Sequence, residues 1–478
     1  MEGFVRSKII CTIGPSSRNP ETLRALKEAG MDVARVNLSH GSFNEHRLLF
    51  KDLRKLEKVA VLFDLPGPKM RLGEFTEPVI LESGAKVVFT VDEVKGSSKL
   101  IPINYEKLPA EVTPGGQLFI NDGLIEIKVT SVHRNLRGFD ALVVSGGEVS
   151  SHKGLNAPGA ALSLRPPTEQ DVEGIKFGVE EGADWFAASF IRSAVDVERV
   201  QAEIANAGGD QPLISKIEHG EALVNIDEII AASDGVMVAR GDLGIEVKPW
   251  DIPLIQKRII AKCNEAGKPV IVATQMLESM VDNPRPTRAE ASDVANALLD
   301  GADAVMLSEE TATGAHPIEA VAAMNSICRV VEADAPLHRR ESRLSEGRPI
   351  ADIIGSLAAR AAEVVKPAAI IVVTRSGFSG QMVSKHRPTP QILVISPDKR
   401  VMRRMHLYWG VEPLNLTWTS DRDDLIIRAV KLSLEKGYMK PDDSIMVVSG
   451  STLEAPGRTS TLEILKVEEI IRHAERRD

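Results

Sequence analysis

An alternation of short apolar runs with helix-like segments most constrains how this chain can fold. The runs are continuous in Val, Ile and Leu, as in AVLFDL at 60–65 and VIVA at 270–273. Strands of this kind are typical of parallel sheets that are buried on both faces. Three strand–helix units precede residue 69, and five more follow residue 153. Eight such units predict an α/β protein built on a TIM (β/α)8 barrel.

The alternation breaks between residues 69 and 153, where no long helical period occurs. Segments that alternate polar and apolar residues, such as KVVFTV at 86–91, indicate β-strands instead. The sequence Asn-Asp-Gly at 121–123 separates two such segments and is a strong hairpin signal. We therefore expect a small β-barrel domain, inserted after the third barrel strand and placed as a lid over the barrel mouth.

A charged segment near residue 336 marks a second boundary, after which strands and helices alternate again. The apolar runs at 368–373, 391–396 and 444–450 predict strands, and helices are expected over 351–364, 399–409 and 423–436. So few units predict a separate, open α/β domain. We expect a barrel domain in two parts, residues 1–68 and 154–335. The inserted lid is expected over residues 69–153, and the C-terminal domain over residues 336–478.

The composition limits the classes of function. The net charge of −9 at pH 7 argues against a general nucleic-acid binder. The three cysteines are far apart, which excludes a disulfide framework or a cysteine zinc site and fits a reducing compartment. No apolar run approaches the roughly 18 residues of a membrane helix, and the N-terminus carries none long enough for a signal peptide. We expect a cytoplasmic protein with neither a membrane nor a nucleic acid as partner.

Every predicted barrel strand ends in polar side chains. Catalytic residues of TIM barrels come from these C-terminal strand ends, where a purely structural barrel does not require polar residues. The set therefore predicts an active site at the barrel mouth. From the first strand to the eighth, the positions are Thr12; Arg35, Asn37, Ser39 and His40; Asp64; Ser189; Lys216 and Glu218; Arg240 and Asp242; Thr274 and Gln275; and Ser308, Glu309, Glu310 and Thr311.

Lys216 and Glu218 lie two residues apart at the end of the fifth predicted strand. Side chains two apart on a strand face the same way, so both are expected at the barrel mouth. Asp242, on the next strand, can approach Glu218, and two carboxylates can bind Mg²⁺ while leaving positions for a substrate. Lys216 adds a positive centre, and Arg35 offers a planar fork for phosphate or carboxylate. These residues indicate an anionic, phosphorylated substrate that is held by a metal.

Alternative interpretations of these residues stay open. Lys216 and Glu218 can form a purely structural ion pair, although their setting among eight polar strand ends disfavours it. We expect Asp242 to cap the helix that follows it and to bind metal at once. His40 is equally well explained as a surface histidine. The usual nucleotide fingerprints, a Walker A loop and GxGxxG, are absent.

Long segments of the chain resemble the motifs of the pyruvate kinase family, in order and through nearly the whole sequence. The motifs are long and collectively specific. They are CTIGPSS (11–17), ARVNLSHG (34–41), FDLPGPKMR (63–71), KGLNAPG (153–159), LISKIEHGEAL (213–223), VMVARGDLG (236–244), VATQMLESM (272–280), PRPTRAEASDVANA (284–297) and MLSEETATGAHPIEAV (306–321).

The resemblance implies a phosphotransferase that moves a phosphoryl group from phosphoenolpyruvate to ADP, giving pyruvate and ATP with Mg²⁺ or Mn²⁺. Glu218 and Asp242 would hold the metal, and Lys216 would stabilise the phosphoryl group in flight. Arg35 would grip the phosphate. By the same resemblance, the substrate carboxylate would meet the backbone of Gly241 and Asp242, Thr274 would serve proton delivery to the enolate, and the nucleotide would meet Asn37, His40, Arg71 and Lys153.

The resemblance also bears on a monovalent cation. Asn37, Ser39, Asp64 and the Leu65 carbonyl match the family's K⁺ ligands, but Lys69 stands where K⁺-dependent members have glutamate. We expect the Lys69 ammonium to substitute for the cation, so that K⁺ is not required. The alternative is that Lys69 is a solvated lysine at the lid hinge. Glu309 and Asn121 also depart from the common pattern, with no clear mechanistic consequence.

The C-terminal domain resembles the part of the family that regulates activity. Two strand ends there offer hydroxyl, N–H and arginine groups suited to a phosphate, in TRSGFSG (374–380) and GSTLEAPGRTS (450–460). The resemblance implies an allosteric site for a phosphorylated effector and a homotetramer, whereas two ordinary turns are the plainer interpretation. The expected effector residues are Thr374, Arg375, Ser376, Gly377, Ser379 and Arg458.

Two other functions compete with this interpretation. Another Mg²⁺ barrel that acts on a pyruvate enolate, such as an aldolase or a lyase, also uses Glu and Asp at strand ends. Such an enzyme needs neither Lys153 on a nucleotide-side lid nor Lys216 at a phosphoryl position. A non-catalytic, metabolite-sensing scaffold is disfavoured because every expected catalytic residue type is present. Formation of ATP from phosphoenolpyruvate and ADP separates the three.

Overall fold

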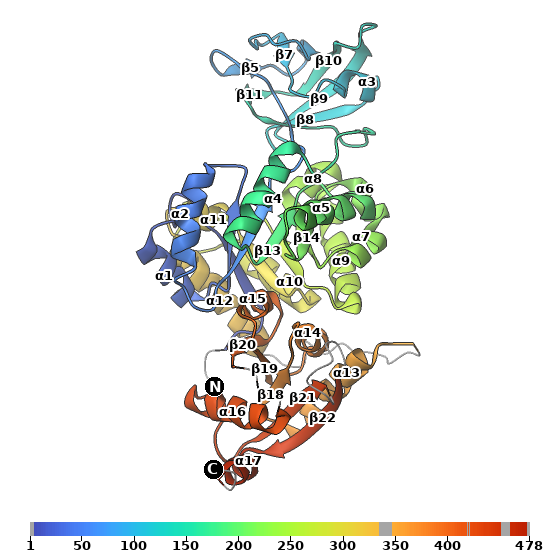
Figure 1. The fold of residues 1–478 in the computed structure, drawn as a ribbon. Coiled ribbons are helices and arrows are strands. Elements are labelled where there is room, and N and C mark those ends of the chain that lie inside the picture. The colour runs from blue at the N-terminus through green and yellow to red at the C-terminus, as the bar shows by residue number, and fades with distance from the viewer. Residues whose placement is uncertain (1–3, 334–346, 418, 420, 451–458, 476–478) are drawn as a thin grey trace.

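The structure is a computed structural model in which three bodies follow one another along a line (Figure 1). The small β domain lies at one end, the barrel in the middle and the C-terminal domain at the other end. No helix among the described residues is long and apolar enough to cross a membrane. The description covers residues 4–333, 347–417, 419, 421–450 and 459–475.

The predicted barrel is confirmed: eight parallel strands close in the order β1-β17-β16-β15-β14-β13-β3-β2. Their bounds are β1 Lys8–Thr12, β2 Val33–Asn37, β3 Ala60–Leu65, β13 Trp185–Ala188, β14 Leu213–Ile217, β15 Gly235–Ala239, β16 Val270–Ala273 and β17 Ala304–Leu307. The helices around it are α1 Pro20–Ala29, α2 Phe43–Leu53, α4 Glu169–Glu181, α5 Ala194–Asn206, α6 Gly220–Val224, α7 Ile226–Ala232, α8 Arg240–Glu246, α9 Ile252–Ala266, α10 Arg288–Asp300, α11 Glu309–Ala312 and α12 Pro317–Ala333.

The barrel strands bury both of their faces, which explains their unbroken apolar runs. On β3, Val61 and Phe63 pack outward against the helices, whereas Ala60 and Leu62 fill the barrel interior. The interior is closed below by Leu407 of the C-terminal domain. Side chains alternate along a strand, so the next inward-facing residue after Leu62 is Asp64, which is polar. The polar layer therefore begins at the C-terminal ends of the strands, where TIM barrels carry their active sites.

The inserted segment forms a seven-stranded sheet in the order β4-β12-β8-β9-β10-β6-β7 and a separate pair, β11 with β5. The predicted hairpin at 121–123 is confirmed, since β8 and β9 pair antiparallel across it and all three of its residues have positive φ. The bounds are β4 Met70–Arg71, β5 Val79–Leu81, β6 Lys86–Thr90, β7 Leu100–Pro102, α3 Leu108–Glu111, β8 Gln117–Ile120, β9 Ile125–Val132, β10 Gly138–Ser145, β11 Gly147–Val149 and β12 Gly154–Asn156.

The C-terminal domain is a five-stranded sheet in the order β20-β19-β18-β21-β22, with β22 antiparallel to its neighbour. The sequence indicated only three of these strands. Its elements are α13 Ile350–Val365, β18 Ala369–Val373, α14 Phe378–Lys385, β19 Gln391–Ser396, α15 Lys399–Arg404, β20 Val411–Asn415, α16 Arg422–Glu435, β21 Ser444–Gly450, β22 Thr459–Lys466 and α17 Val467–Glu475. Most of the charged segment after residue 336 lies outside the described residues.

Two helices are shorter than the sequence predicted. The helix expected over 43–58 ends at Leu53. The helix expected over 399–409 ends at Arg404 and continues as a 3₁₀ turn, Met405–Leu407. The tighter turn directs Leu407 into the barrel interior, so tertiary packing overrides the local helical pattern there.

The barrel floor and the C-terminal domain are joined by a buried carboxylate. Asp184, which is 1% exposed, lies 2.7 Å from Arg54 and 2.7 Å from Arg403, and its Oδ2 accepts a hydrogen bond from the Val61 amide at 2.8 Å. Arg54 follows helix α2 and Arg403 belongs to α15, so one side chain links two barrel elements to the C-terminal domain.

We predict that Asp184→Asn lowers the free energy of unfolding by about 3 kcal/mol, because it leaves two arginines without their shared carboxylate. Urea unfolding measures the loss. The control is Asp227→Asn, which removes one partner of the exposed ion pair with Lys262 and should cost about 1 kcal/mol or less. Equal losses in the two variants would show that Asp184 does not hold the domains together.

Candidate functional site

The inward-facing polar residues of neighbouring strands form one layer at the barrel mouth. Val33, Leu62 and Ile214 fill the interior on β2, β3 and β14. Two residues further along the same strands stand Arg35, Asp64 and Lys216, respectively. The strand period of two therefore delivers two cations and a carboxylate to the same level.

Lys216 occupies the centre of this layer. Its Nζ lies 2.9 Å from Glu218 Oε1 and 3.2 Å from Asp64 Oδ1, and it donates to the Ser189 hydroxyl at 2.8 Å. Only 9% of the residue is exposed. Burial favours the neutral amine, but Asp64 and Glu218 outweigh it and raise the pKa of Lys216 above its ordinary value. The side chain therefore stays positively charged across physiological pH.

Arg35 shares a carboxylate with Lys216. Its Nε and Nη2 lie 2.7 Å and 2.6 Å from Asp64 Oδ2, and its Nη1 donates to the Thr12 hydroxyl at 2.8 Å. Burial alone would favour the neutral acid, yet Lys216 and Arg35 lower the pKa of Asp64. One carboxylate thus holds two cations side by side, where both can face phosphate oxygens.

Glu218 and Asp242 are the candidate metal ligands. Glu218 is 1% exposed, and its Oε2 accepts a hydrogen bond from the Phe190 amide at 2.8 Å. Burial raises the pKa of Glu218, and the negative charge of Asp242 raises it further. The positive charge of Lys216 lowers it but does not cancel these two effects. A divalent cation would relieve this repulsion, and Mg²⁺ commonly takes only one or two carboxylates. No group of three or more His, Cys, Asp or Glu that could hold a metal ion occurs in the described part of the chain, and the assignment of Glu218 and Asp242 as ligands stays a prediction.

The expected capping role of Asp242 is wrong. The residue lies in the first turn of α8, inside the helix, whereas the N-cap position is Ala239, which makes no side-chain cap hydrogen bond. The Oδ1 of Asp242 is instead 3.5 Å from Lys69 Nζ, because the carboxylate faces the base of the lid. The Lys69 side chain is 27% exposed, which places it at the site rather than free in solvent.

Arg240, to which the sequence gave no role, supports the strained turn after β16. Thr274 and Gln275 have φ of 68° and 54°, a left-handed conformation that β-branched residues avoid. Arg240 Nη2 donates to their two carbonyls at 2.7 Å and 3.1 Å, and its Nη1 pairs with Asp293 at 2.6 Å. The turn holds the Thr274 hydroxyl where the Gly241 amide donates to it at 2.8 Å. The sequence signal that could have pointed to Arg240 is its position at a strand end, directly before Gly241 and Asp242.

The predicted nucleotide residues come from two domains. Arg71 pairs with Gly154 across β4 and β12, which places Lys153 next to it at the base of the lid. Asn37 is the last residue of β2 on the barrel, and the exposed His40 follows that strand. A cavity of 1030 Å³ opens between the lid and the barrel, lined by Asp122 on one side and Gly241 on the other. The cavity leaves room for a ligand between the two domains, but its lining includes none of the four predicted nucleotide residues.

The predicted monovalent-cation ligands are largely engaged within the protein. Asn37 Oδ1 accepts a hydrogen bond from the Ser39 amide at 3.1 Å, and the Leu65 carbonyl accepts one from the Ser189 hydroxyl at 2.9 Å. Asp64 is occupied by two cations, as described above. Ser189 therefore links the Leu65 carbonyl to the Lys216 ammonium, a positioning role that the sequence did not reveal because a lone serine carries no pattern.

The predicted effector residues lie in the C-terminal domain, on the side of the barrel opposite the lid (Figure 1). Thr374 Oγ1 accepts a hydrogen bond from the Gly377 amide at 3.1 Å, and Gly377 has a φ of 88°. The Ser379 hydroxyl lies 2.5 Å from that of Thr459. Arg375 and Ser376 are exposed. Arg458 lies outside the described residues.

Comparisons with known proteins agree with this arrangement of domains. Residues 4–321 match the family model described as pyruvate kinase, barrel domain, and residues 352–465 match the pyruvate kinase alpha/beta domain. A pyruvate kinase of Sporosarcina psychrophila is 41% identical over 96% of this chain and 80% of its own length. One of Geobacillus stearothermophilus is 40% identical over 98% and 81%, and pyruvate kinase 2 of Synechocystis is 39% identical over 98% and 80%. This chain therefore belongs to the pyruvate kinase family.

Proposed function

We propose that this chain is a pyruvate kinase that transfers a phosphoryl group from phosphoenolpyruvate to ADP, the final step of glycolysis. The observation that carries the proposal is the buried ammonium of Lys216, which lies 2.9 Å from the carboxylate of Glu218. A phosphoryl group in transit needs fixed positive charge more than it needs covalent chemistry. The family membership of nearly the whole chain supports the same conclusion.

The proposed roles are those that the family resemblance implies, and the positions of Arg35 and Lys216 at the barrel mouth support them. Arg35 and Lys216 bind the phosphate of the substrate, and Lys216 follows the phosphoryl group as its charge spreads. The Gly241 and Asp242 amides orient the carboxylate, and Thr274 lies at the face of the enolate that receives a proton. A bound Mg²⁺ or Mn²⁺, held by Glu218 and Asp242, supplies charge neutralisation between the two substrates.

The lid supplies the nucleotide side of the site in this proposal. Arg71 and Lys153 would approach ADP from the lid, and Asn37 and His40 from the barrel. Closure of the lid would then exclude water from the transferring phosphoryl group. The alternatives, an enolate aldolase or lyase and a non-catalytic scaffold, predict no ATP from phosphoenolpyruvate and ADP, so a coupled assay for that product tests the proposal directly.

The proposal extends to regulation and assembly. The C-terminal domain would bind a phosphorylated effector at Thr374–Ser379 and Arg458, and the chain would assemble as a homotetramer. The domain limits of 69–153 for the lid and 336–478 for the regulatory domain belong to the same proposal. The exposed hydroxyl of Ser376 and the left-handed Gly377 support an anion-binding turn.

We predict that Lys216→Met lowers kcat by ~10³-fold or more with little change in KM, because it removes a charge that acts in the transition state. Lys8→Met is the matched control. Lys8 is a second buried lysine of the same barrel, 2% exposed at the floor and paired with Asp32. It should lose stability but keep its kcat. Turnover near the wild-type value in Lys216→Met would refute the role.

We predict that Glu218→Gln and Asp242→Asn each raise the Mg²⁺ concentration needed for half-maximal activity while leaving the fold intact, since each removes one ligand charge. Glu309→Gln, at an exposed carboxylate that follows β17, is the control and should titrate like the wild type. Metal binding can be followed separately with Mn²⁺ by electron paramagnetic resonance. Wild-type Mn²⁺ affinity in both variants would exclude the pair as ligands.

We predict that activity is nearly equal in tetramethylammonium and potassium salts at matched ionic strength, because the Lys69 ammonium already stands beside Asp242. Lys69→Glu should create a requirement for K⁺. The same change at Lys99, an exposed lysine of the lid, should not. A wild-type enzyme that is inert until K⁺ is added would contradict the assignment.

A further inference from the structure

A buried cluster of polar side chains lies where the lid rejoins the barrel, and no role proposed above uses it. Its members are Asn156 on β12 of the lid, Arg192 after β13, His219 after β14 and Glu246 at the end of α8. The first three residues are buried, and the side chain of Glu246 is 6% exposed. Four parts of the chain therefore bring polar groups together out of solvent.

Glu246 is at the centre of this cluster. Its Oε2 lies 3.4 Å from His219 Nε2. Burial raises the pKa of Glu246 to about 7, against the opposing charge of Arg192. Hydrogen bonding by the Gly220 amide and by the side chain of Asn156 also favours the charged form. The carboxylate is thus held by donors from the barrel and from the lid.

Three buried atoms of the cluster have no hydrogen-bond partner in the described part of the chain. They are the Oδ1 of Asn156, the Nε of Arg192 and the Nε2 of His219. The Nδ1 of His219 accepts a hydrogen bond from the Glu221 amide at 3.1 Å, so Nε2 carries the hydrogen of the neutral ring. Buried groups are rarely left unpaired. Because Nε2 lies only 3.4 Å from Glu246, a small shift of either element would complete that hydrogen bond.

Arg192 holds the segment that leads from the lid back to the barrel, residues 157–168, which we call the lid return. Its Nη1 donates to the Leu162 carbonyl at 3.1 Å, and its Nη2 donates to the Leu164 carbonyl. Asn156 immediately precedes this segment. The barrel therefore contacts the lid return at its middle through Arg192, and just before its start through the cluster around Glu246.

Helix α8 contacts both chain segments that connect the lid to the barrel. Asp242, in its first turn, lies 3.5 Å from Lys69 on the outgoing segment. Glu246, one turn later, meets Asn156 at the start of the returning segment. Residues four apart lie on the same side of a helix, so one short helix joins both connections to a candidate metal ligand.

We propose that Glu246 is a positioning residue for the proposed reaction: it ties the lid to α8 through Asn156 and so sets where Lys153 meets the nucleotide. Lys153 is three residues before Asn156, and Gly154 between them pairs with Arg71 across β12 and β4. A short paired strand transmits the position of one residue to the next. The inference rests on the proposed function for the assignment of Lys153 and Arg71 to ADP.

Glu246→Gln keeps the shape of the side chain and removes its charge. We expect the KM for ADP to rise at least about fivefold and the KM for phosphoenolpyruvate to change less than about twofold. The reason is that Arg35 and Lys216 stand on the barrel, whereas Lys153 moves with the lid. General damage to the fold would not separate the two constants. An unchanged KM for ADP, or an equal rise of both constants, would overturn the proposal.

Hydrogen exchange measures the tie without any assay of activity. Mass spectrometry of the full chain should show amide exchange at least about threefold faster across residues 153–168 in Glu246→Gln, with β14 unchanged. Unchanged exchange there would show that Glu246 does not hold the lid. A wild-type chain that forms no ATP would instead refute the proposed function and the role of Lys153 in it, while the exchange result still decides whether the tie exists.

Asn156→Ala removes the same contact from the lid side, and it carries the test if Glu246→Gln does not fold. It should raise the KM for ADP and speed exchange as Glu246→Gln does. The double variant should differ from either single variant by less than about twofold, because both changes remove one interaction. Effects that multiply in the double variant would show that the two side chains act separately and would refute the tie.

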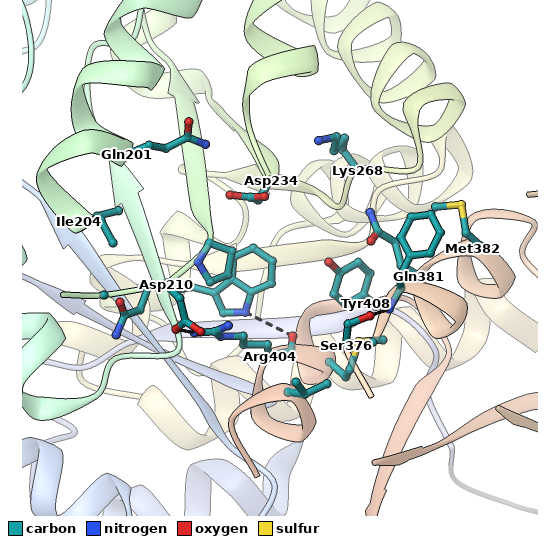
Figure 2. Close-up of a pocket in the computed structure, with 18 of the residues that line it drawn as sticks. Gln201, Ile204, Asp210, Asp234, Lys268, Ser376, Gln381, Met382, Arg404 and Tyr408 are labelled. Carbon is teal, nitrogen blue, oxygen red and sulfur yellow. Dashed lines mark hydrogen bonds and ion pairs between the residues drawn. The ribbon is translucent and has the colours of Figure 1, made fainter. Parts of the chain in front are cut away.

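Two controls at the barrel floor separate this role from a general loss of stability. Glu332→Gln changes a buried carboxylate that accepts hydrogen bonds from the amides of Arg6 and Ser7, both at 2.7 Å. Asp234→Asn changes a carboxylate at the opposite end of β15 from α8, on the lining of a cavity beside the C-terminal domain (Figure 2). Both variants should keep the wild-type KM for ADP and the wild-type exchange of residues 153–168. Changes in either control as large as those in Glu246→Gln would refute a specific role for Glu246.

Discussion

The ammonium of Lys216, held between Asp64 and Glu218, is the interaction on which the site depends. A lysine this deeply buried would lose its proton without compensation, and each carboxylate would be costly without the lysine. Because the pKa of Lys216 is raised in the folded chain, its contribution to stability is complete below the unfolded pKa. The contribution is lost only as the pH rises through the folded value. The charge of Lys216 and its contribution to stability are thus both constant at physiological pH.

The barrel strands carry this arrangement from one end of the molecule to the other. The same alternation that packs Leu62 and Ile214 inside the barrel presents Asp64 and Lys216 at its mouth. At the floor, Asp184, which immediately precedes the barrel strand β13, joins Arg54 to Arg403 of the C-terminal domain. The strands of one rigid barrel therefore carry the candidate active site at the mouth and the contacts with the C-terminal domain at the floor.

The sequence predicted what periodicity and strand-end chemistry encode. Continuous apolar runs gave the barrel, and a spacing of two placed Lys216 beside Glu218. It placed Arg240 and Ser189 at the barrel mouth but not their individual roles, because Arg240 binds backbone carbonyls and Ser189 is a lone hydroxyl without a sequence pattern. Strand β22 was missed because it is an antiparallel strand with many partly exposed residues. The capping role expected of Asp242 failed because α8 begins at Arg240, so Asp242 lies inside the first turn and Ala239 occupies the N-cap position.

The central claim is that Lys216 remains an ammonium in the resting protein, and its titration tests this most directly. Trace acetylation of amines between about pH 7 and pH 11, read by mass spectrometry, gives a midpoint for each lysine. The exposed Lys99 of the lid serves as the internal reference. We predict that the midpoint of Lys216 lies above that of Lys99. A midpoint below it would mean that burial outweighs Asp64 and Glu218, and would contradict the account.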